Sequence, residues 1–290
     1  MTRMGTAIVR PNRLLIRFAG YWLAVNQRSM NTIRPSICAL HMVASCGVLL
    51  FACAASGEEK PKGYEVITGF DAAPQSLYWY DEAIVALNHD MAKDGFLFRM
   101  YGSLAVYNYA SSDVPGGNVD GKLWQLDLMP GYQIARGGAT FGGYVGLDYQ
   151  DSQLTPIDPT NKLRGTQTGI KVAGSFDFED EKQPIATSLA AEYSTAFDTY
   201  LAELRVGARV CKNLFIGPDA SVDGDTGYNA QRLGGFAKYT FALTKDMPLK
   251  LTLVAGHQFV SGSGDSRGDS GGGFGGAAGT YGTIEFDANF

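Results

Sequence analysis

Apolar and polar side chains alternate along most of this chain. The segment 96–109 shows the pattern clearly, with Phe96 and Phe98 in one alternating set and Arg99 and Tyr101 in the other. Successive side chains of a β-strand point to opposite faces of its sheet. A period of two therefore predicts strands with one apolar and one polar face.

Twelve segments of this kind follow one another, each about as long as a tilted strand that crosses a bilayer. They are Tyr64–Ala72, Leu77–Asn88, Phe96–Tyr109, Leu123–Ile134, Thr140–Gln150, Gly165–Phe178, Ile185–Phe197, Tyr200–Cys211, Leu214–Ser221, Arg232–Leu243, Leu249–Val260 and Gly279–Phe290. If the last strand pairs with the first, the sheet closes and no backbone edge is left unpaired, as a lipid environment requires. The predicted fold is all-β, a single antiparallel transmembrane β-barrel of about twelve strands.

The connections between these segments alternate in length, which supports the barrel independently. Short connections rich in Gly, Asp, Asn and Lys suit tight hairpins on the periplasmic side, and longer ones suit the outer side. The predicted long loops are Ala110–Gly121, Asp151–Arg164, Asp223–Asn229 and Ser261–Ala278. Two connections, Ala73–Ser76 and Asp198–Thr199, are shorter than this alternation predicts. Both termini are expected in the periplasm.

The first 54 residues have a different character. A basic start after Met30 leads into the apolar run Ile37–Ala52, and Ala52–Ala54 supplies an A-x-A cleavage signal. We interpret residues 1–54 as an upstream extension plus a secretory signal peptide, with Met30 as the working start, and residues 55–290 as the outer-membrane barrel. A membrane-anchor helix and a lipoprotein signal are the alternatives.

A water-soluble barrel or sandwich would show the same alternation. The export leader, the aromatic final residue and the charges on the face opposite the apolar one favour the membrane barrel. Three positions fit it poorly: Asp81 falls on the lipid-facing side, and Pro130 and Pro218 each remove a backbone donor from a strand.

Composition excludes several classes of protein. The net charge of −5 and the scattered basic residues argue against a nucleic-acid partner. After cleavage the chain keeps His89, His257 and Cys211, too few for a His/Cys metal cluster or an intrachain disulfide. We expect no metal and no cofactor.

Two motifs suggest enzymes, and neither is complete. Gly268–Gly272 resembles the nucleophile segment of chymotrypsin-type proteases, but no histidine base stands in the expected setting. Outer-membrane lipid A deacylases use a histidine and a serine two residues apart, and Phe259 occupies that position after His257. We predict that the protein is not an enzyme, with the deacylase-like barrel as an open alternative.

The polar face of the strands is the candidate functional surface. Twelve strands leave a narrow or filled lumen, between the packed interior of small barrels and the channel of large ones. Its charges either stabilise the interior by pairing or, with the tyrosines, contact a sugar polymer. The candidate residues are Arg99, Tyr101, Tyr107, Asp127, Tyr144, Asp148, Lys171, Glu192, Glu203, Arg205, Arg209 and Arg232.

Several short stretches resemble a known family. They are Thr68–Asp71, Ser76–Tyr80, Ala86–Asn88, Asp94–Arg99, Pro130–Gln133 and Phe215–Ala220. Together they resemble the BcsS family of bacterial outer-membrane proteins of cellulose biosynthesis. The resemblance implies an accessory role in making or exporting cellulose, and as partners outer-membrane lipid together with the secretion machinery or the glucan itself. It implies no reaction and no set of functional residues, and a small-solute porin remains an alternative.

Overall fold

The structure is a computed structural model that describes residues 63–180, 182–244, 247–261 and 277–290. These residues form β1 (Tyr64–Ala73), β2 (Ser76–Ala86), β3 (Gly95–Ala110), β4 (Asn118–Arg136), β5 (Ala139–Thr155), β6 (Gly165–Phe178), β7 (Ile185–Ser194), β8 (Tyr200–Cys211), β9 (Leu214–Gly224), β10 (Asn229–Thr244), β11 (Met247–Ser261) and β12 (Gly279–Asn289). No helix within these ranges is long and apolar enough to cross a membrane. The predicted leader and the motif Gly268–Gly272 lie outside the described residues.

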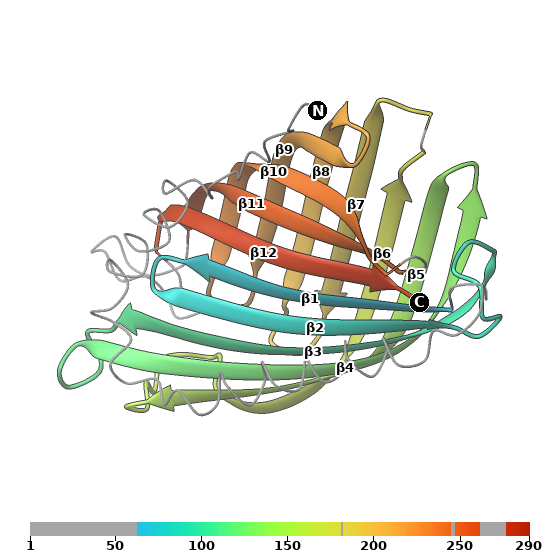
Figure 1. The fold of residues 1–290 in the computed structure, drawn as a ribbon. Coiled ribbons are helices and arrows are strands. Elements are labelled where there is room, and N and C mark those ends of the chain that lie inside the picture. Colours follow the sequence, from blue (N-terminus) through green and yellow to red (C-terminus); the bar gives the residue numbers. More distant parts are fainter. Residues whose placement is uncertain (1–62, 181, 245–246, 262–276) are drawn as a thin grey trace, which may run out of the picture. The chain divides into compact units, whose positions relative to one another are not determined.

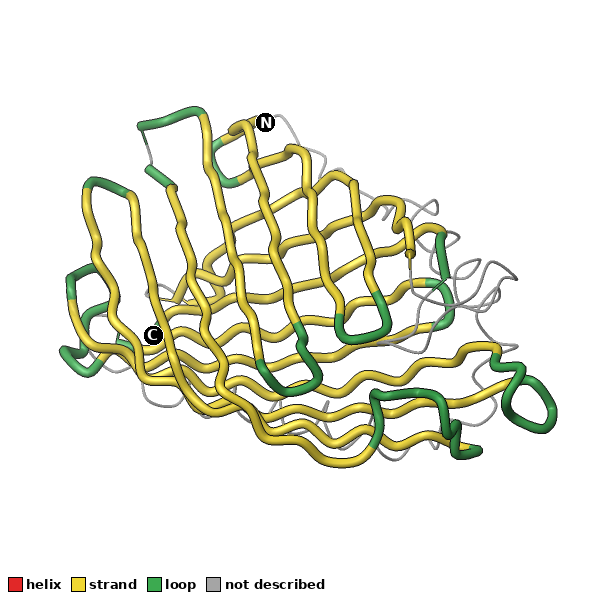
Figure 2. The backbone as a smooth tube through the Cα atoms, turned by 180° about the vertical axis from the view of Figure 1, so that it is seen from behind, coloured by secondary structure: helices red, strands yellow, loops and turns green. Residues whose placement is uncertain are grey.

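The strands close into one antiparallel barrel (Figure 1). Each strand pairs with its neighbours in sequence, and β12 pairs with β1 in a register that sets Phe70 opposite Ile284. The backbones of Tyr64 and Phe290 exchange hydrogen bonds of 3.1 and 2.8 Å at the end of this seam. Figure 2 shows the connections gathered at the two ends of the barrel. The predicted all-β closed barrel is confirmed.

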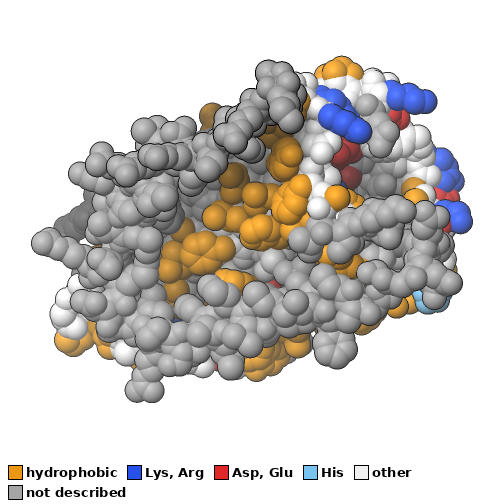
Figure 3. All heavy atoms as spheres, viewed as in Figure 1, with side chains coloured by type: hydrophobic (Ala, Val, Ile, Leu, Met, Phe, Trp, Pro, Cys, Tyr) orange, Lys and Arg blue, Asp and Glu red, His pale blue; other side chains and the backbone are white. Residues whose placement is uncertain are grey.

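Side chains alternate between the two faces of the wall as the sequence pattern predicts. On β4 and β5 the outward Leu126 and Leu147 are 46% and 57% exposed, whereas the inward Asp127 and Asp148 are fully buried. Among the side chains visible in Figure 3, apolar groups occupy the wall and charged groups gather toward one end. A closed wall with an apolar exterior leaves no strand edge unpaired, which is the condition for spanning lipid.

Several strands are longer than predicted. β4 begins at Asn118 rather than Leu123, and β5 continues to Thr155, so that Asp120 still pairs with Thr155. Both predicted loops at this end are shortened accordingly. In contrast, β7 ends at Ser194, because Phe197 and the residue after it take positive φ values of 53° and 52° and form the turn to β8.

The two prolines are accommodated by gaps in the ladder and not by a shift of register. Between β4 and β5 the pairing stops at Leu128 and resumes in the same register at Gly131, on either side of Pro130. The ladder between β8 and β9 has a similar gap beside Pro218. There the backbones approach so closely that a Cβ on Gly217 would lie 1.9 Å from the Val206 carbonyl oxygen. Proline has no backbone N–H, but where the ladder already has a gap its absence breaks no hydrogen bond.

Asp81 points outward, as its place in the alternation predicts. The Trp79 indole donates a hydrogen bond to the Asp81 carboxylate at 3.1 Å. A second outward pair, Trp124 and Asp151, makes the same contact at 3.1 Å between β4 and β5. An indole donor beside each carboxylate offsets part of the cost of placing it on the apolar wall.

Candidate functional site: the barrel lumen

The interior of the barrel contains a cavity of about 980 Å³. Its lining includes Asp90 and Met91 from the turn after β2 and, toward the opposite end, Gly224 and Tyr228 around the loop after β9. The cavity therefore extends along the barrel from the end with the short turns toward the end with the longer loops.

The twelve candidate residues all lie on the inward side of the wall, but the structure does not gather them into one site. Arg99, Tyr101, Asp127, Tyr144, Asp148, Lys171 and Glu192 form one group on β3 to β7, and Glu203 and Arg205 belong to a second on β8. Arg232 on β10 anchors a third. Tyr107 and Arg209 lie apart, near opposite ends of the barrel.

The first group is built on two buried cations. Lys171 Nζ lies 2.7 Å from Asp127 Oδ2 and 2.8 Å from Glu192 Oε1. Arg99 reaches Glu192 at 3.3 Å and Glu82 at 2.6 Å, while its guanidinium lies 5.4 Å from the centre of the Tyr101 ring. Each of the two buried cations is thus paired with two carboxylates, the condition under which a buried charge is tolerated.

The second and third groups repeat this arrangement around arginines. Arg205 binds Glu203 at 2.7 Å, and Asp219 and Glu285 each at 3.1 Å. Arg232 binds Asp71 at 3.0 Å, and its Nε donates to the Gln258 side-chain oxygen at 2.8 Å. A guanidinium has five donors in a fixed fork, so one arginine can hold several acceptors at once.

Two of these ion pairs cross the lumen. Arg99 on β3 contacts Glu192 on β7, and Arg205 on β8 contacts Glu285 on β12, in each case with three strands of the wall between the partners. Such pairs cannot form along the wall, where neighbours are one strand apart. We call them the two cross-lumen bridges, and all four of their residues line the cavity.

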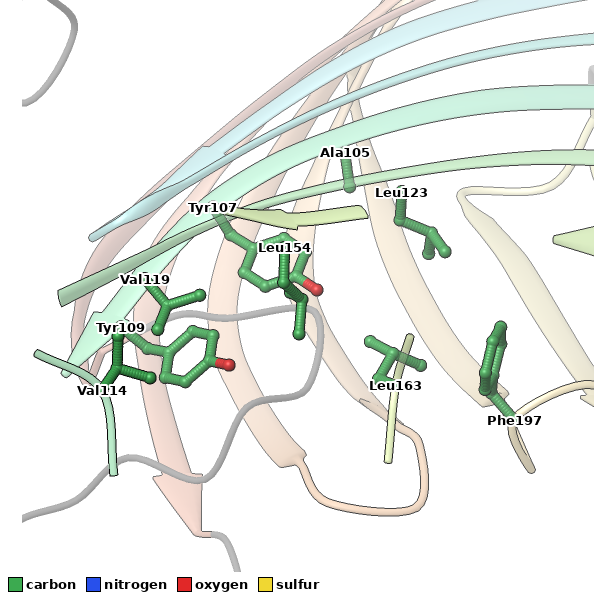
Figure 4. Packing of buried hydrophobic residues seen from close by; sticks show 9 residues of the cluster. All are labelled: Ala105, Tyr107, Tyr109, Val114, Val119, Leu123, Leu154, Leu163 and Phe197. Carbon is green, nitrogen blue, oxygen red and sulfur yellow. The ribbon is translucent and has the colours of Figure 1, made fainter. Parts of the chain in front are cut away.

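Apolar side chains fill part of the lumen at the loop end (Figure 4). Leu163 from the loop after β5 and Phe197 from the turn after β7 are almost fully buried in a cluster with the inward Tyr107 and Leu123. Hydrogen bonds fix both segments, since Ser152 donates to the Leu163 carbonyl at 2.9 Å. The Phe197 amide likewise donates to a glutamine side chain on β6 at 2.8 Å. The loop end is therefore more apolar than the middle of the barrel.

Carboxylates outnumber cations along the cavity. The acidic lining residues are Glu65, Asp71, Glu82, Asp90, Asp177, Glu179, Glu192, Glu203, Asp223, Glu285 and Asp287, and the basic ones are Arg99, Lys171, Arg205, Arg232, Lys238 and Lys250. Burial opposes ionisation of Glu179, just beyond the end of β6, but Lys238, with its Nζ 2.6 Å away, holds the pKa of that carboxyl below its usual range. The lumen thus presents an excess of negative charge.

Important members of these groups were not predicted from the sequence. Tyr78, Tyr80 and Glu82 line the cavity from β2, and Asp219 binds Arg205 from β9. The signal for the β2 residues was present, because Asp81 had already been placed on the outward face, and alternation puts Tyr80 and Glu82 on the inner one.

No catalytic or metal arrangement is evident in the part of the chain that the structure describes. His257 is outward and exposed, with its ring centre 4.7 Å from that of Phe259 and with Leu233 and Thr280 as its partners in the ladder. Cys211 is a free, exposed thiol. Among the described residues, no group of three or more His, Cys, Asp or Glu could hold a metal ion.

The family described as "Cellulose biosynthesis protein BcsS" matches residues 66–290. Comparison with curated proteins gave no match. Similar solved structures include the KdgM porin in complex with disordered oligogalacturonate, at 9% identity over 78% of this chain and 98% of that one, TM-score 0.35. The β-domain of the Bordetella autotransporter BrkA is 13% identical over 79% of this chain and all of that one, TM-score 0.43. CdiB from Escherichia coli is 9% identical over 80% and 64%, TM-score 0.40.

Proposed function

Because this chain belongs to the BcsS family of cellulose biosynthesis proteins, we propose that it acts as a non-enzymatic accessory component of cellulose production or export. The observation that carries the proposal is the family match, which spans nearly the whole barrel from residue 66 to residue 290. The chain is an outer-membrane β-barrel, so the proposed role is exercised at the outer membrane.

A role without catalysis is supported by how the polar lumen residues are used. Lys171, Arg99 and Arg205 are each committed to two or more carboxylates. Such saturated ion pairs stabilise and shape an interior, whereas a catalytic group needs a nucleophile and a base within reach of each other and of a substrate. The lumen is better suited to hold or guide a partner than to transform one.

The candidate partners are the glucan itself and the secretion machinery that delivers it. A cavity of about 980 Å³ lined by tyrosines and paired charges supports direct contact with a polar polymer. Outer-membrane lipid surrounds the apolar wall in either case.

A clean chromosomal deletion tests the accessory role. We expect the deletion strain to lose extracellular cellulose under conditions in which its parent makes it, and to regain it when the gene is restored on a plasmid. The readout is cellulose dye binding confirmed by cellulase-released glucose. Unchanged cellulose in the deletion strain would remove the proposed role.

A small-solute porin is the second candidate, because the cavity extends toward both ends of the barrel. The purified barrel in a planar bilayer is expected to conduct weakly, since the cross-lumen bridges and the apolar cluster with Leu163 obstruct the interior. Any current should favour cations, because the carboxylates that line the cavity outnumber its basic side chains. The reversal potential in a potassium chloride gradient measures this. A large, stable conductance would favour the porin, and anion selectivity would contradict the charge argument.

A further inference from the structure

Three tyrosines form a continuous aromatic group in the middle of the lumen. The ring centres of Tyr78 and Tyr80 on β2 are 5.8 Å apart, and those of Tyr80 and Tyr101 on β3 are 6.2 Å apart with nearly parallel planes. The hydroxyls of Tyr78 and Tyr101 are hydrogen-bonded to each other. All three residues line the cavity, and Tyr78 and Tyr80 remain half-buried, so parts of their rings are accessible from it.

This tyrosine group connects the two cross-lumen bridges. At one side, Arg99 and Lys171 lie 5.4 and 5.1 Å from the centre of the Tyr101 ring. At the other, the Tyr80 hydroxyl donates to Glu285 at 2.6 Å, and Glu285 in turn binds Arg205. The rings are therefore held in place before any ligand arrives, which reduces the entropy that binding would cost.

We infer that this group, which we call the tyrosine waist, is a binding site in the lumen for an extended, neutral glucan chain. The inference rests on the proposed function and names the ligand class of the lumen. A β-linked glucose ring offers apolar C–H faces and a rim of hydroxyls. The accessible parts of the Tyr78 and Tyr80 rings match the former, and the charged groups of the bridges beside them match the latter.

The charge of the lumen further restricts the chemical class of ligand that can bind. Carboxylates such as Glu82, Glu192 and Glu203 surround the tyrosine waist in excess over cations. These three are paired with cations, but the surplus of carboxylates along the cavity would repel a uronic acid polymer, because water screens charges poorly in this interior. A neutral sugar chain has no such penalty. Because the cavity extends toward both ends of the barrel, it can hold several sugars of an extended chain and is not limited to a single sugar.

Binding of cellohexaose to the purified full-length barrel in detergent tests the inference by isothermal titration calorimetry. We expect the unaltered protein to bind cellohexaose and not oligogalacturonate. The substitution Tyr80→Ala should weaken the binding of cellohexaose by at least about tenfold. The matched control is Tyr239→Ala, which removes an outward tyrosine that is 45% exposed and should leave the affinity unchanged.

A second variant covers the case in which Tyr80→Ala does not fold, as judged by circular dichroism and by heat-modifiable migration on gels. Ala190→Trp keeps the tyrosines and places a large ring at a cavity-lining position of β7, so it should also weaken binding. No binding by the unaltered protein, or equal affinity in Ala190→Trp, would overturn the inference.

The outcomes for this site and for the accessory role are separable. Loss of cellulose in the deletion strain with no binding of cellohexaose contradicts the tyrosine waist alone. Binding that depends on Tyr80, with cellulose unchanged in the deletion strain, supports the site and contradicts the accessory role.

Discussion

Replacing Lys171 by alanine is expected to lower the free energy of unfolding of the barrel by about 3–5 kcal/mol. The Lys171 side chain is 3% exposed and neutralises Asp127, whose side chain is fully buried, and Glu192. Without the ammonium group, both carboxylates stay in the interior short of a cation, and the cost of burying them is no longer offset. Urea unfolding of the protein refolded into lipid bilayers, followed by tryptophan fluorescence, measures the change.

The matched control is Lys93→Ala. Lys93 also pairs with a carboxylate, Asp90, at 2.8 Å, but its side chain is 73% exposed. Exposed pairs of this kind contribute little to stability, because water screens the two charges and the side chains lose freedom on pairing. If the two substitutions cost the same, the lumen pairs are not the buried network that the geometry indicates.

Replacing Gly217 by valine is expected to destabilise the barrel by about 3 kcal/mol or to prevent its folding. A Cβ at this position would meet the Val206 carbonyl oxygen at 1.9 Å, which is backbone and cannot rotate away. The side chain would force β8 and β9 apart beside Pro218, where their ladder already has a gap. The folded fraction after refolding into detergent micelles, seen by heat-modifiable migration on gels, gives the result.

Gly143→Val makes the same chemical change at a permissive site. Gly143 is an exposed position of β5, and a Cβ there has no atom within 4 Å. Because valine suits a strand and nothing has to move, we expect a change within about 0.5 kcal/mol. If Gly143→Val and Gly217→Val lowered the stability equally, close approach of the backbones would not be the reason for glycine at position 217.

The fold was predictable because its signal is local. A period of two identifies strands wherever one face meets an apolar medium, and all twelve were found in this way. The ends of strands were less predictable. Asp120 and Gly121 look like turn residues, yet they continue β4 because β5 extends far enough to pair with both. Whether a turn-forming residue stays in a strand depends on its partner, which the local pattern does not contain.

The same contrast between local patterns and distant partners explains which contacts in the lumen were not predicted. Alternation placed Arg99 and Glu192 on the inner face, but it could not show that they meet, since they are 93 residues apart in sequence and lie on strands that do not pair. Which charges face each other across a barrel is decided by its cross-section and by the stagger of its strands. Glu82 was overlooked because the prediction followed the outward residues of β2 and not the alternate set.

The seam between β1 and β12 has a consequence for how the barrel forms. Asp71 and Thr283 are bonded partners across it although 212 residues separate them in sequence. Until β12 is in place, one edge of β1 has a row of unpaired backbone donors and acceptors, the kind of edge that captures other chains. Contacts of such long range form slowly. The yield of folded barrel therefore depends on how long that edge is kept from other chains before the seam closes, as well as on the stability of the finished wall.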